Sequence, residues 1–235
     1  MIIALRKGKE RMNIIDAIRK RKSIRGYKPD PVTKTVIREI LEIAIRAPSA
    51  MNTQPWEFAV VAGEPLRKIR EESAKKLNAG EFPQPEHHVV GWTNDSIYRV
   101  RQVDLAKHIF QIMNIPREDK VKRAAWMERG FRYFDAPAAI VIFVDKALTE
   151  TGPVLDVGAV MQNICLAALH SGLGTCIHDQ GVMYPDVIKK YACIPESKRL
   201  IIAISLGYPD EENVVNTITS TRESVDDLTS WIGFP

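Results

Sequence analysis

The amino-acid sequence predicts one domain that combines helices with a buried sheet. Short continuous apolar runs, which are typical of buried strands, occupy residues 56–62, 138–144 and 200–206. A further strand is expected to follow the tight turn of residues 172–177. Between these runs, apolar residues recur at helical spacing. The chain has 235 residues, of which 45% are apolar and 26% charged, so it is long enough and apolar enough to bury a substantial core.

Two helices are expected before the first strand. Residues 13–21 form the first and residues 33–46 the second. Thr33 is a suitable N-cap for the second helix, and Pro48 ends it. Its inner face should consist of Ile37, Ile40, Leu41 and Ala44.

The middle of the chain is predicted to be helical around one irregular segment. Residues 63–78 read as a charged helix, and residues 95–113 and 117–133 as two more. Residues 78–94 contain glycine, proline and two adjacent histidines, and a loop of this length is usually functional or mobile. The last of these helices carries large apolar side chains that either pack in the core or line a pocket: Trp126, Met127, Phe131, Tyr133 and Phe134.

The C-terminal part should contain a central helix and a polar tail. Residues 153–171 are apolar around most of the helix circumference, which is typical of a central or interface helix. Residues 184–191 form a short helix. After residue 209 the tail is polar, but it ends with Trp231, Ile232 and Phe234, which we expect to dock on this chain or on another subunit.

Composition disfavours nucleic-acid binding and membrane insertion. The formal net charge is +4, but acidic and basic residues are mixed through most of the chain and no nucleic-acid docking motif is present. No apolar run approaches the roughly 20 residues that span a bilayer, and the first residues do not resemble a signal peptide. We therefore expect a cytoplasmic protein. Cys165, Cys176 and Cys193 lack zinc-site spacing, so we expect reduced thiols and no metal site.

Two short blocks carry the chemistry. Residues 21–25 (RKSIR) place three cations and a hydroxyl at the end of the first helix, which suits the binding of a phosphate. Residues 47–56 (APSAMNTQPW) place small polar groups between two prolines beside a strand, where a flat ligand could lie. Together they suggest a phosphorylated, planar, redox-active cofactor. Taken singly, each block also has a plain structural explanation, since cations oppose the dipole at a helix C-terminus.

The common alternative motifs are missing. The sequence has no GxSxG motif, no phosphate-binding Walker loop and no GxGxxG motif between a strand and a helix. Gly172-Leu173-Gly174 follows a helix and precedes a strand, which is the reverse of the dinucleotide-binding order. A Rossmann-type dehydrogenase and a serine hydrolase are therefore disfavoured.

The blocks in this order resemble the nitroreductase family of FMN-dependent oxidoreductases. The resemblance runs from about residue 13 to residue 228, and residues 131–137 resemble a branch of larger bacterial members with extra helices in the middle of the chain. The matching positions are Arg21-Lys22-Ser23-Ile24-Arg25, Ala47-Pro48-Ser49, Asn52, Gln54-Pro55-Trp56, Phe58, Gly172 to Cys176, Leu206 to Pro209 and Arg222.

The resemblance implies an α+β fold with a central, mostly antiparallel sheet flanked by helices. Residues 1–12 would be an N-terminal extension, and residues 13–235 a single FMN-binding domain in which residues 78–134 form an inserted cap. Two chains would form an intertwined homodimer that exchanges its C-terminal extensions. FMN would lie at the subunit interface, held tightly but without a covalent bond.

The resemblance also implies site residues. The phosphate would be held by Arg21, Lys22, Ser23 and Arg222. Arg25 would reach the pyrimidine edge of the isoalloxazine ring, and Arg132 would lie near N1, where its charge favours the anionic reduced flavin. The partner subunit would cover the ring and ribityl chain with Pro48, Ser49, Ala50 and Asn52. The turn around residues 176–179 would place a backbone N–H near flavin N5, with Cys176, Ile177 and His178 contributing.

The implied activity is a ping-pong flavin reductase. NADH or NADPH would reduce the flavin, and an electron-poor acceptor such as a nitroaromatic or a quinone would then be reduced at the same face. Trp126 and Phe131 would line the substrate pocket. Two alternatives remain: another flavin reaction on the same fold, such as reductive dehalogenation, or a non-catalytic FMN-binding protein. Many family members have lysine two residues before the late arginine, where this chain has Ser220.

Overall fold

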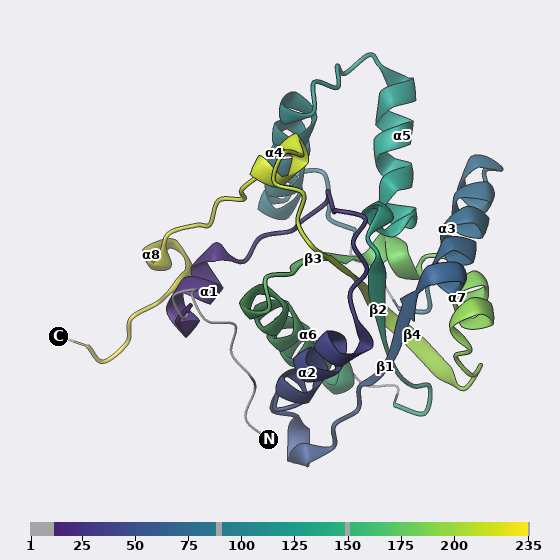
Figure 1. The fold of residues 1–235 in the computed structure, drawn as a ribbon. Helices are drawn as coiled ribbons and strands as arrows, with labels where there is room; N and C mark the ends of the chain where they lie inside the picture. Colours follow the sequence, from purple (N-terminus) through teal and green to yellow (C-terminus); the bar gives the residue numbers. More distant parts are fainter. Residues whose placement is uncertain (1–11, 88–90, 149–150, 235) are drawn as a thin grey trace.

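One four-stranded antiparallel sheet organises the protein. The computed structural model describes residues 12–87, 91–148 and 151–234. The strands are β1 (Glu57–Ala62), β2 (Ala138–Asp145), β3 (Gly174–His178) and β4 (Lys198–Gly207), and their order in the sheet is β1-β2-β4-β3 (Figure 1). Each neighbouring pair is antiparallel. The predicted α+β class with an antiparallel sheet is confirmed.

Helices lie close to their predicted positions, and the first two begin at N-caps that the local sequence encodes. The caps Asn13 and Thr33 accept hydrogen bonds from Asp16 N (2.9 Å) and Val36 N (3.4 Å). The helices are α1 (Ile14–Lys20), α2 (Lys34–Ala44), α3 (Gly63–Asn78), α4 (Ile97–Ile112), α5 (Lys120–Phe131), α6 (Gly152–His170), α7 (Pro185–Ala192) and α8 (Val225–Leu228). Short 3₁₀ turns are η1 (Ala50–Asn52), η2 (Tyr133–Asp135), η3 (Asp179–Val182) and η4 (Val214–Thr217).

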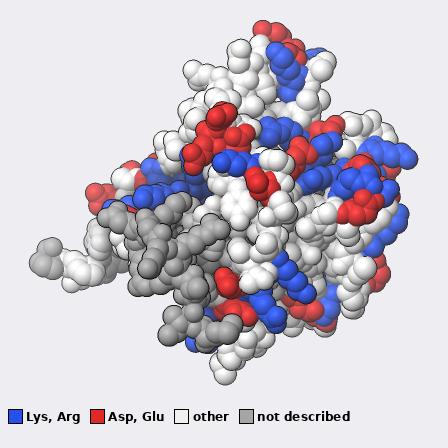
Figure 2. All heavy atoms as spheres, viewed as in Figure 1, with Lys and Arg blue, Asp and Glu red and all other residues white. Residues whose placement is uncertain are grey.

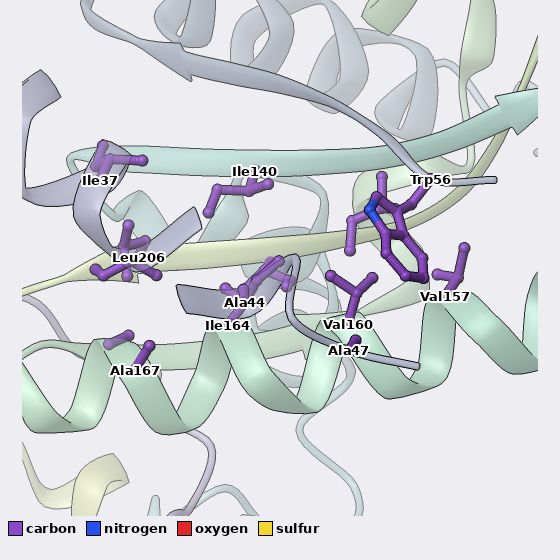
Figure 3. Packing of buried hydrophobic residues seen from close by; sticks show 14 of the residues in the cluster. Ile37, Ala44, Ala47, Trp56, Ile140, Val157, Val160, Ile164, Ala167 and Leu206 are labelled. Atoms are coloured by element: carbon purple, nitrogen blue, oxygen red, sulfur yellow. The ribbon is translucent and has the colours of Figure 1, made fainter. Parts of the chain in front are cut away.

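Strand β2 is buried on both faces and separates two layers of helices. Its residues alternate, so that Ile140, Ile142 and Val144 face the cluster with α2 and α6, while Val141 and Phe143 face the cluster with α3 and α7. In the first cluster, residues of α6 face the sheet beside the end of α2 and the start of β1 (Figure 3): Val157, Val160, Ile164, Ala167, Ile37, Ala44, Ala47, Trp56, Ile140 and Leu206.

Strand β1 differs from the sequence prediction. The apolar run of residues 56–62 predicts a buried strand, but β1 lies at the edge of the sheet and, within the described part of the chain, pairs only with β2. Within the strand only Val61 is buried, and Val60 is 44% exposed. An apolar run marks a strand, but its place in the sheet depends on pairings that are distant in sequence.

Helix α6 is central, as its nearly continuous apolar surface predicted. By length and hydropathy alone this helix could cross a membrane. Core helices of globular proteins meet the same criteria, and α6 buries Val157, Val160 and Ile164 against the sheet. Its N-terminal turns still expose Leu155, at 78%. The face of α6 that points away from the sheet is thus partly uncovered in a single chain.

The described parts of the irregular segment, residues 79–87 and 91–94, contain no helix or strand, in agreement with the prediction.

An ionic cluster fixes this segment to the sheet. Glu86 accepts from Lys189 Nζ (2.6 Å), from Lys146 Nζ (3.0 Å) and from the backbone N–H of Leu200 (3.0 Å). The Lys189 side chain is only 3% exposed, and its second partner, Glu196, is 82% exposed. Glu86 is therefore the main counter-charge of a buried ammonium group.

Replacing Glu86 tests this anchor. Burial by itself raises the pKa of Glu86, but the hydrogen bonds from Lys189, Leu200 and Lys146 outweigh it and lower the pKa below its usual range. We expect Glu86→Gln to reduce the free energy of unfolding by about 1–3 kcal/mol at neutral pH, measured by urea denaturation. Protonation of Glu86 removes the same charge as the substitution does. The difference in unfolding free energy between the variant and the unmodified protein should therefore decrease as pH falls through the folded-state pKa of Glu86.

Glu196→Gln is the matched control, because it removes the other carboxylate from the same lysine. Since Glu196 is exposed, the loss should stay below about 1 kcal/mol. Equal effects of the two substitutions would show that Glu86 is not the principal partner of Lys189.

Candidate cofactor site

The basic segment of residues 21–25 leaves α1 and runs along the outer edge of β3. Ser23 forms a parallel bridge to Thr175, and Ile24 N donates to Thr175 O (2.9 Å). The backbones can approach here because position 174 is glycine: a Cβ on Gly174 would lie 2.5 Å from Cγ1 of Ile24. The Gly172–Gly174 motif thus brings the basic segment against the sheet.

A buried amide holds the segment from the other side. Asn216, in η4, accepts from Arg25 N (2.9 Å) and Gly26 N (3.1 Å) and donates to Gly26 O (2.7 Å) and Asp210 O (2.9 Å). Lys22 Nζ donates to the Asn216 carbonyl. Sequence reasoning missed Asn216, because an asparagine in a polar tail carries no signal of such a role.

The cations of this segment are not neutralised by acids. Among the described residues, no carboxylate forms an ion pair with Lys20, Arg21, Lys22 or Arg25. Some cations elsewhere, such as Lys189 and Lys198, do form ion pairs, and Figure 2 shows acidic and basic side chains interspersed over much of the visible face. A surplus of donors within six residues suits a phosphate dianion.

A cavity of about 360 Å³ lies beside these cations, between the C-terminal end of α6, the start of β3 and the segment after β4. Lys20, Arg21 and Lys22 line one side of it, and Asp210 and Glu211 line another. Its apolar wall includes Cys165, Leu169 and Leu173. The volume lies within the range of small-molecule sites.

The second block lies at the opposite end of α6. Ala50 N is 3.3 Å from both carboxylate oxygens of Asp156, in the second turn of α6. The cavity wall contains Leu169, which is 13 residues further along the helix, or about 20 Å at the α-helical rise. Within one chain the structure therefore does not bring the Pro48–Asn52 block to the basic segment.

The loop around Asn52 has a specific backbone geometry and an open surface. Met51, Asn52 and Gln54 have positive φ angles of 50°, 58° and 48°, and Gln54 N donates to Ser49 Oγ (2.9 Å). Pro48, Ala50 and Asn52 are exposed, and Met51 is 97% exposed. Left-handed geometry at residues other than glycine costs free energy and often occurs at functional sites.

The predicted turn at residues 176–179 is wrong in detail. Cys176, Ile177 and His178 are strand residues of β3, and the chain turns only afterwards, in η3. The reason is pairing: these three residues lie opposite Ser205, Ile204 and Ala203 of β4. Cys176 is buried and Ile177 half-buried.

His178 is a core histidine. Ser205 Oγ donates to Tyr133 O (2.9 Å), so it must accept from His178 Nε2 at 2.8 Å, which fixes the proton on Nε2. Among the described residues, Nδ1 has no hydrogen-bond partner. Burial, assisted by the charge of Arg25, lowers the pKa of His178 to about 3, so the ring stays neutral. This side chain supports η2 and β4.

His87 lies in the irregular segment, and His88 lies outside the described residues.

The aromatic residues near the end of α5 divide into two groups. Phe131 is 6% exposed and packs on Tyr184 and Val187 of the α7 layer. Of the two roles expected for it, Phe131 has the core-packing role in this structure. Trp126 is half-buried, with its ring centroid 6.4 Å from that of Phe134.

Arg132 ends α5 as its C-cap, and its guanidinium is 2.7 Å from Asp135 and 4.0 Å from Glu128. The predicted flavin-facing cation is therefore already paired with carboxylates. Sequence reasoning overlooked its neighbour Arg129, whose Nη2 donates to the carbonyl of Arg25 (2.7 Å).

Arg222 lies on the exposed C-terminal arm, before α8. Its Nη1 donates to Ser220 Oγ (2.8 Å) and to the carbonyl of Thr221 (2.7 Å), so Ser220 contacts this arginine directly. Glu223 pairs with Arg101 of α4 (2.9 Å). Beyond α8 the arm extends away from the rest of the chain (Figure 1), and Trp231, Ile232 and Phe234 are 61%, 85% and 71% exposed.

No metal site accompanies these residues. Among the described residues no group of three or more histidine, cysteine or acidic side chains could hold a metal ion. Cys165, Cys176 and Cys193 are all free thiols.

Comparisons with known proteins agree with this architecture. Residues 18–208 match the model of the Nitroreductase family. A nitrobenzene nitroreductase of Ectopseudomonas oleovorans is 30% identical over 228 residues, covering 93% of this chain and 96% of the relative. A 4-nitrobenzoate reductase of Pseudomonas putida is 30% identical over 217 residues, covering 91% and 93%.

Among solved structures, the FMN and NADPH-dependent nitroreductase NfnB from sphigopyxis sp. strain HMH superimposes with a TM-score of 0.90 at 27% identity. That comparison covers 95% of this chain and all of the other. The residues matched by the family model include the basic segment and all four strands of the sheet. On these grounds the chain belongs to the nitroreductase family.

Proposed function

We propose that this protein is an FMN-dependent reductase that takes electrons from NADH or NADPH and passes them to nitroaromatic compounds. The observation that carries the proposal is the group of cations Lys20, Arg21, Lys22 and Arg25, which form no ion pair with a carboxylate of the described residues and lie beside a cavity of about 360 Å³. The relatives that span nearly the whole chain are named as reductases of nitrobenzene and 4-nitrobenzoate.

The residues present fit a flavin mononucleotide. Arg21, Lys22 and Ser23 would bind its phosphate, because their donors lie in one extended segment fixed by the Thr175 bridge and by Asn216. Arg25 would meet the pyrimidine edge of the ring, and Arg222 would reach the phosphate from the C-terminal arm. FMN bound there supplies the hydride chemistry, while the protein binds it, orients it and limits solvent access.

We further propose that each site is built from two chains. Within one chain the Pro48–Asn52 loop contacts Asp156 near the start of α6, whereas the cavity beside the basic segment is lined by Leu169, about 20 Å further along the helix. The two blocks therefore lie toward opposite ends of α6. A homodimer in which the loop of one subunit meets the basic segment of the other resolves this separation. Exposed apolar side chains on α1, on α6 and on the C-terminal arm support such an assembly: Ile14, Ile15, Ile18, Leu155, Trp231, Ile232 and Phe234.

The donor and the acceptor would use the site in turn. The solved neighbour described as FMN and NADPH-dependent supports a nicotinamide donor, and the named relatives support nitroaromatic acceptors. The burial of Phe131 removes one residue that could have covered the ring in a non-catalytic flavin carrier. Rapid reduction of the bound flavin by NADPH or NADH alone would distinguish a reductase from a specialised flavin enzyme. We also propose cytoplasmic action, in keeping with three free cysteines.

Comparing FMN with riboflavin tests the phosphate site. We expect Arg21→Met to weaken FMN binding about 10- to 100-fold, because a charge-assisted hydrogen bond to phosphate is lost. Riboflavin lacks the phosphate, so its affinity should be unchanged within about twofold. Both affinities can be measured by quenching of flavin fluorescence with the apoprotein.

The control is Arg19→Met. Arg19 lies two residues earlier, is exposed and does not line the cavity. The Arg19→Met variant should bind FMN and riboflavin with the same affinities as the unmodified protein. If Arg21→Met and Arg19→Met behaved alike, the phosphate would have to bind elsewhere.

Mixing two defective chains tests the shared site. Arg21→Met disables the basic segment, and Asn52→Trp disables the loop by removing the amide and adding bulk. If each site combines the two chains, refolding an equal mixture gives heterodimers in which one site carries both substitutions and the other carries neither. Random pairing should then restore about a quarter of the FMN sites. A mixture that binds no more FMN than its separate components would contradict the shared site.

A further inference from the structure

Arg129 makes an isolated, directed contact to the basic segment. Its Nη2 donates to the carbonyl of Arg25 at 2.7 Å, across 104 residues of sequence, and its guanidinium lies 5.4 Å from the ring centre of Trp126. Among the described residues it forms no ion pair with a carboxylate. Burial lowers the pKa of Arg129, although the nearby Asp135 opposes this. Burying a cation partly, with only a carbonyl as its hydrogen-bond partner, costs folding free energy. We therefore expect Arg129 to have a specific structural or functional role.

The contact completes the fixation of Arg25. The N–H of Arg25 is held by Asn216 Oδ1 at 2.9 Å, and its C=O is held by Arg129, so both peptide groups beside this residue are fixed. The Arg25 guanidinium lies 5.9 Å from the ring centre of Phe134, which in turn is 6.4 Å from Trp126. Backbone and side chain of Arg25 are thus both oriented.

The end of α5 that carries Arg129 is itself rigidly docked. Gln180 Nε2 donates to Met127 O (3.0 Å), and Asn78 Nδ2 donates to Glu128 (2.9 Å). Gly130 lets η3 approach, since a Cβ there would lie 1.7 Å from Gln180 Oε1. Arg129 therefore projects from a fixed point on the cap.

We propose that Arg129 is a positioning residue for the cofactor: it holds the Arg25 peptide so that the Arg25 guanidinium meets the pyrimidine edge of the flavin, and it thereby links the α4–α5 cap to the cofactor. This inference rests on the proposed function, because Arg25 acts on FMN only if FMN binds here. Arg129 acts through Arg25, at the ring end of the ligand, whereas Arg21 acts at the phosphate end.

The experiment is a double-substitution cycle on the full-length chain. FMN and riboflavin affinities are measured for the unmodified protein, Arg129→Met, Arg25→Met and the double variant. Arg129→Met should weaken binding of both flavins by the same factor, about tenfold, because the ring end is affected. In the Arg25→Met background the further loss should be less than about twofold, because Arg129 then has no guanidinium to position.

Arg123→Met is the matched control. Arg123 also lies on α5, stacks on an aromatic ring (Phe110, 4.1 Å) and donates to a carbonyl (Pro116 O, 3.3 Å), but it does not contact the basic segment. It should leave both flavin affinities unchanged. Arg129→Lys keeps the charge but loses the planar fork of donors, and should weaken binding by an intermediate factor.

The outcomes separate the two proposals. If the unmodified protein binds FMN and Arg129→Met behaves like Arg123→Met, the inference is wrong while the proposed function stands. A full tenfold loss in the Arg25→Met background would also overturn it, because Arg129 would then act independently. If the unmodified protein binds no FMN, the proposed function itself fails. Should Arg129→Met not fold, as judged by circular dichroism, Arg129→Lys carries the test, and an affinity equal to that of the unmodified protein would refute the inference.

Discussion

The amide of Asn216 is the contact on which the candidate site depends. It is 6% exposed and uses both its oxygen and its nitrogen, joining Arg25 and Gly26 near the start of the chain to Asp210 after the last strand. Ser23 of the basic segment forms a bridge to β3, and Tyr27, two residues after the segment, forms a bridge to the chain after β4. A buried amide with every group satisfied is rigid, because losing any partner leaves a polar group without water. The cations are therefore presented from a fixed backbone.

A second constraint is the length of α6. Asp156, which contacts the Asn52 loop, and Leu169, which lines the cavity beside the basic segment, lie about 20 Å apart along this helix. The loop is itself well fixed, since Ser49 Oγ and the Asp156 carboxylate hold a backbone with positive φ angles. A rigid, exposed loop of this kind suits the proposed contact with the cofactor site of a neighbouring subunit.

The interior network around His178 shows why residue type alone misleads. A histidine near the expected flavin could serve catalysis or the core. Pairing of β3 with β4 places it against Ser205, and the Ser205–Tyr133 hydrogen bond fixes its tautomer. The burial of Phe131 is likewise decided by a distant partner, Val187 of α7. The exposure of β1 is decided by its pairing with β2 at the edge of the sheet. Such partners are distant in sequence and leave no local signal.

The sequence by itself determined most of the helices and strands and the two motif blocks, because caps, prolines and apolar periodicity act over a few residues. Thr33 and the RKSIR block are examples. The α+β class with an antiparallel sheet was implied by the family resemblance of those blocks. Only the tertiary structure decided that β1 is an edge strand, that residues 176–178 pair in β3 and that Asn216 and Arg129 hold Arg25. Those features depend on contacts between segments up to 191 residues apart, and no short-range pattern encodes them.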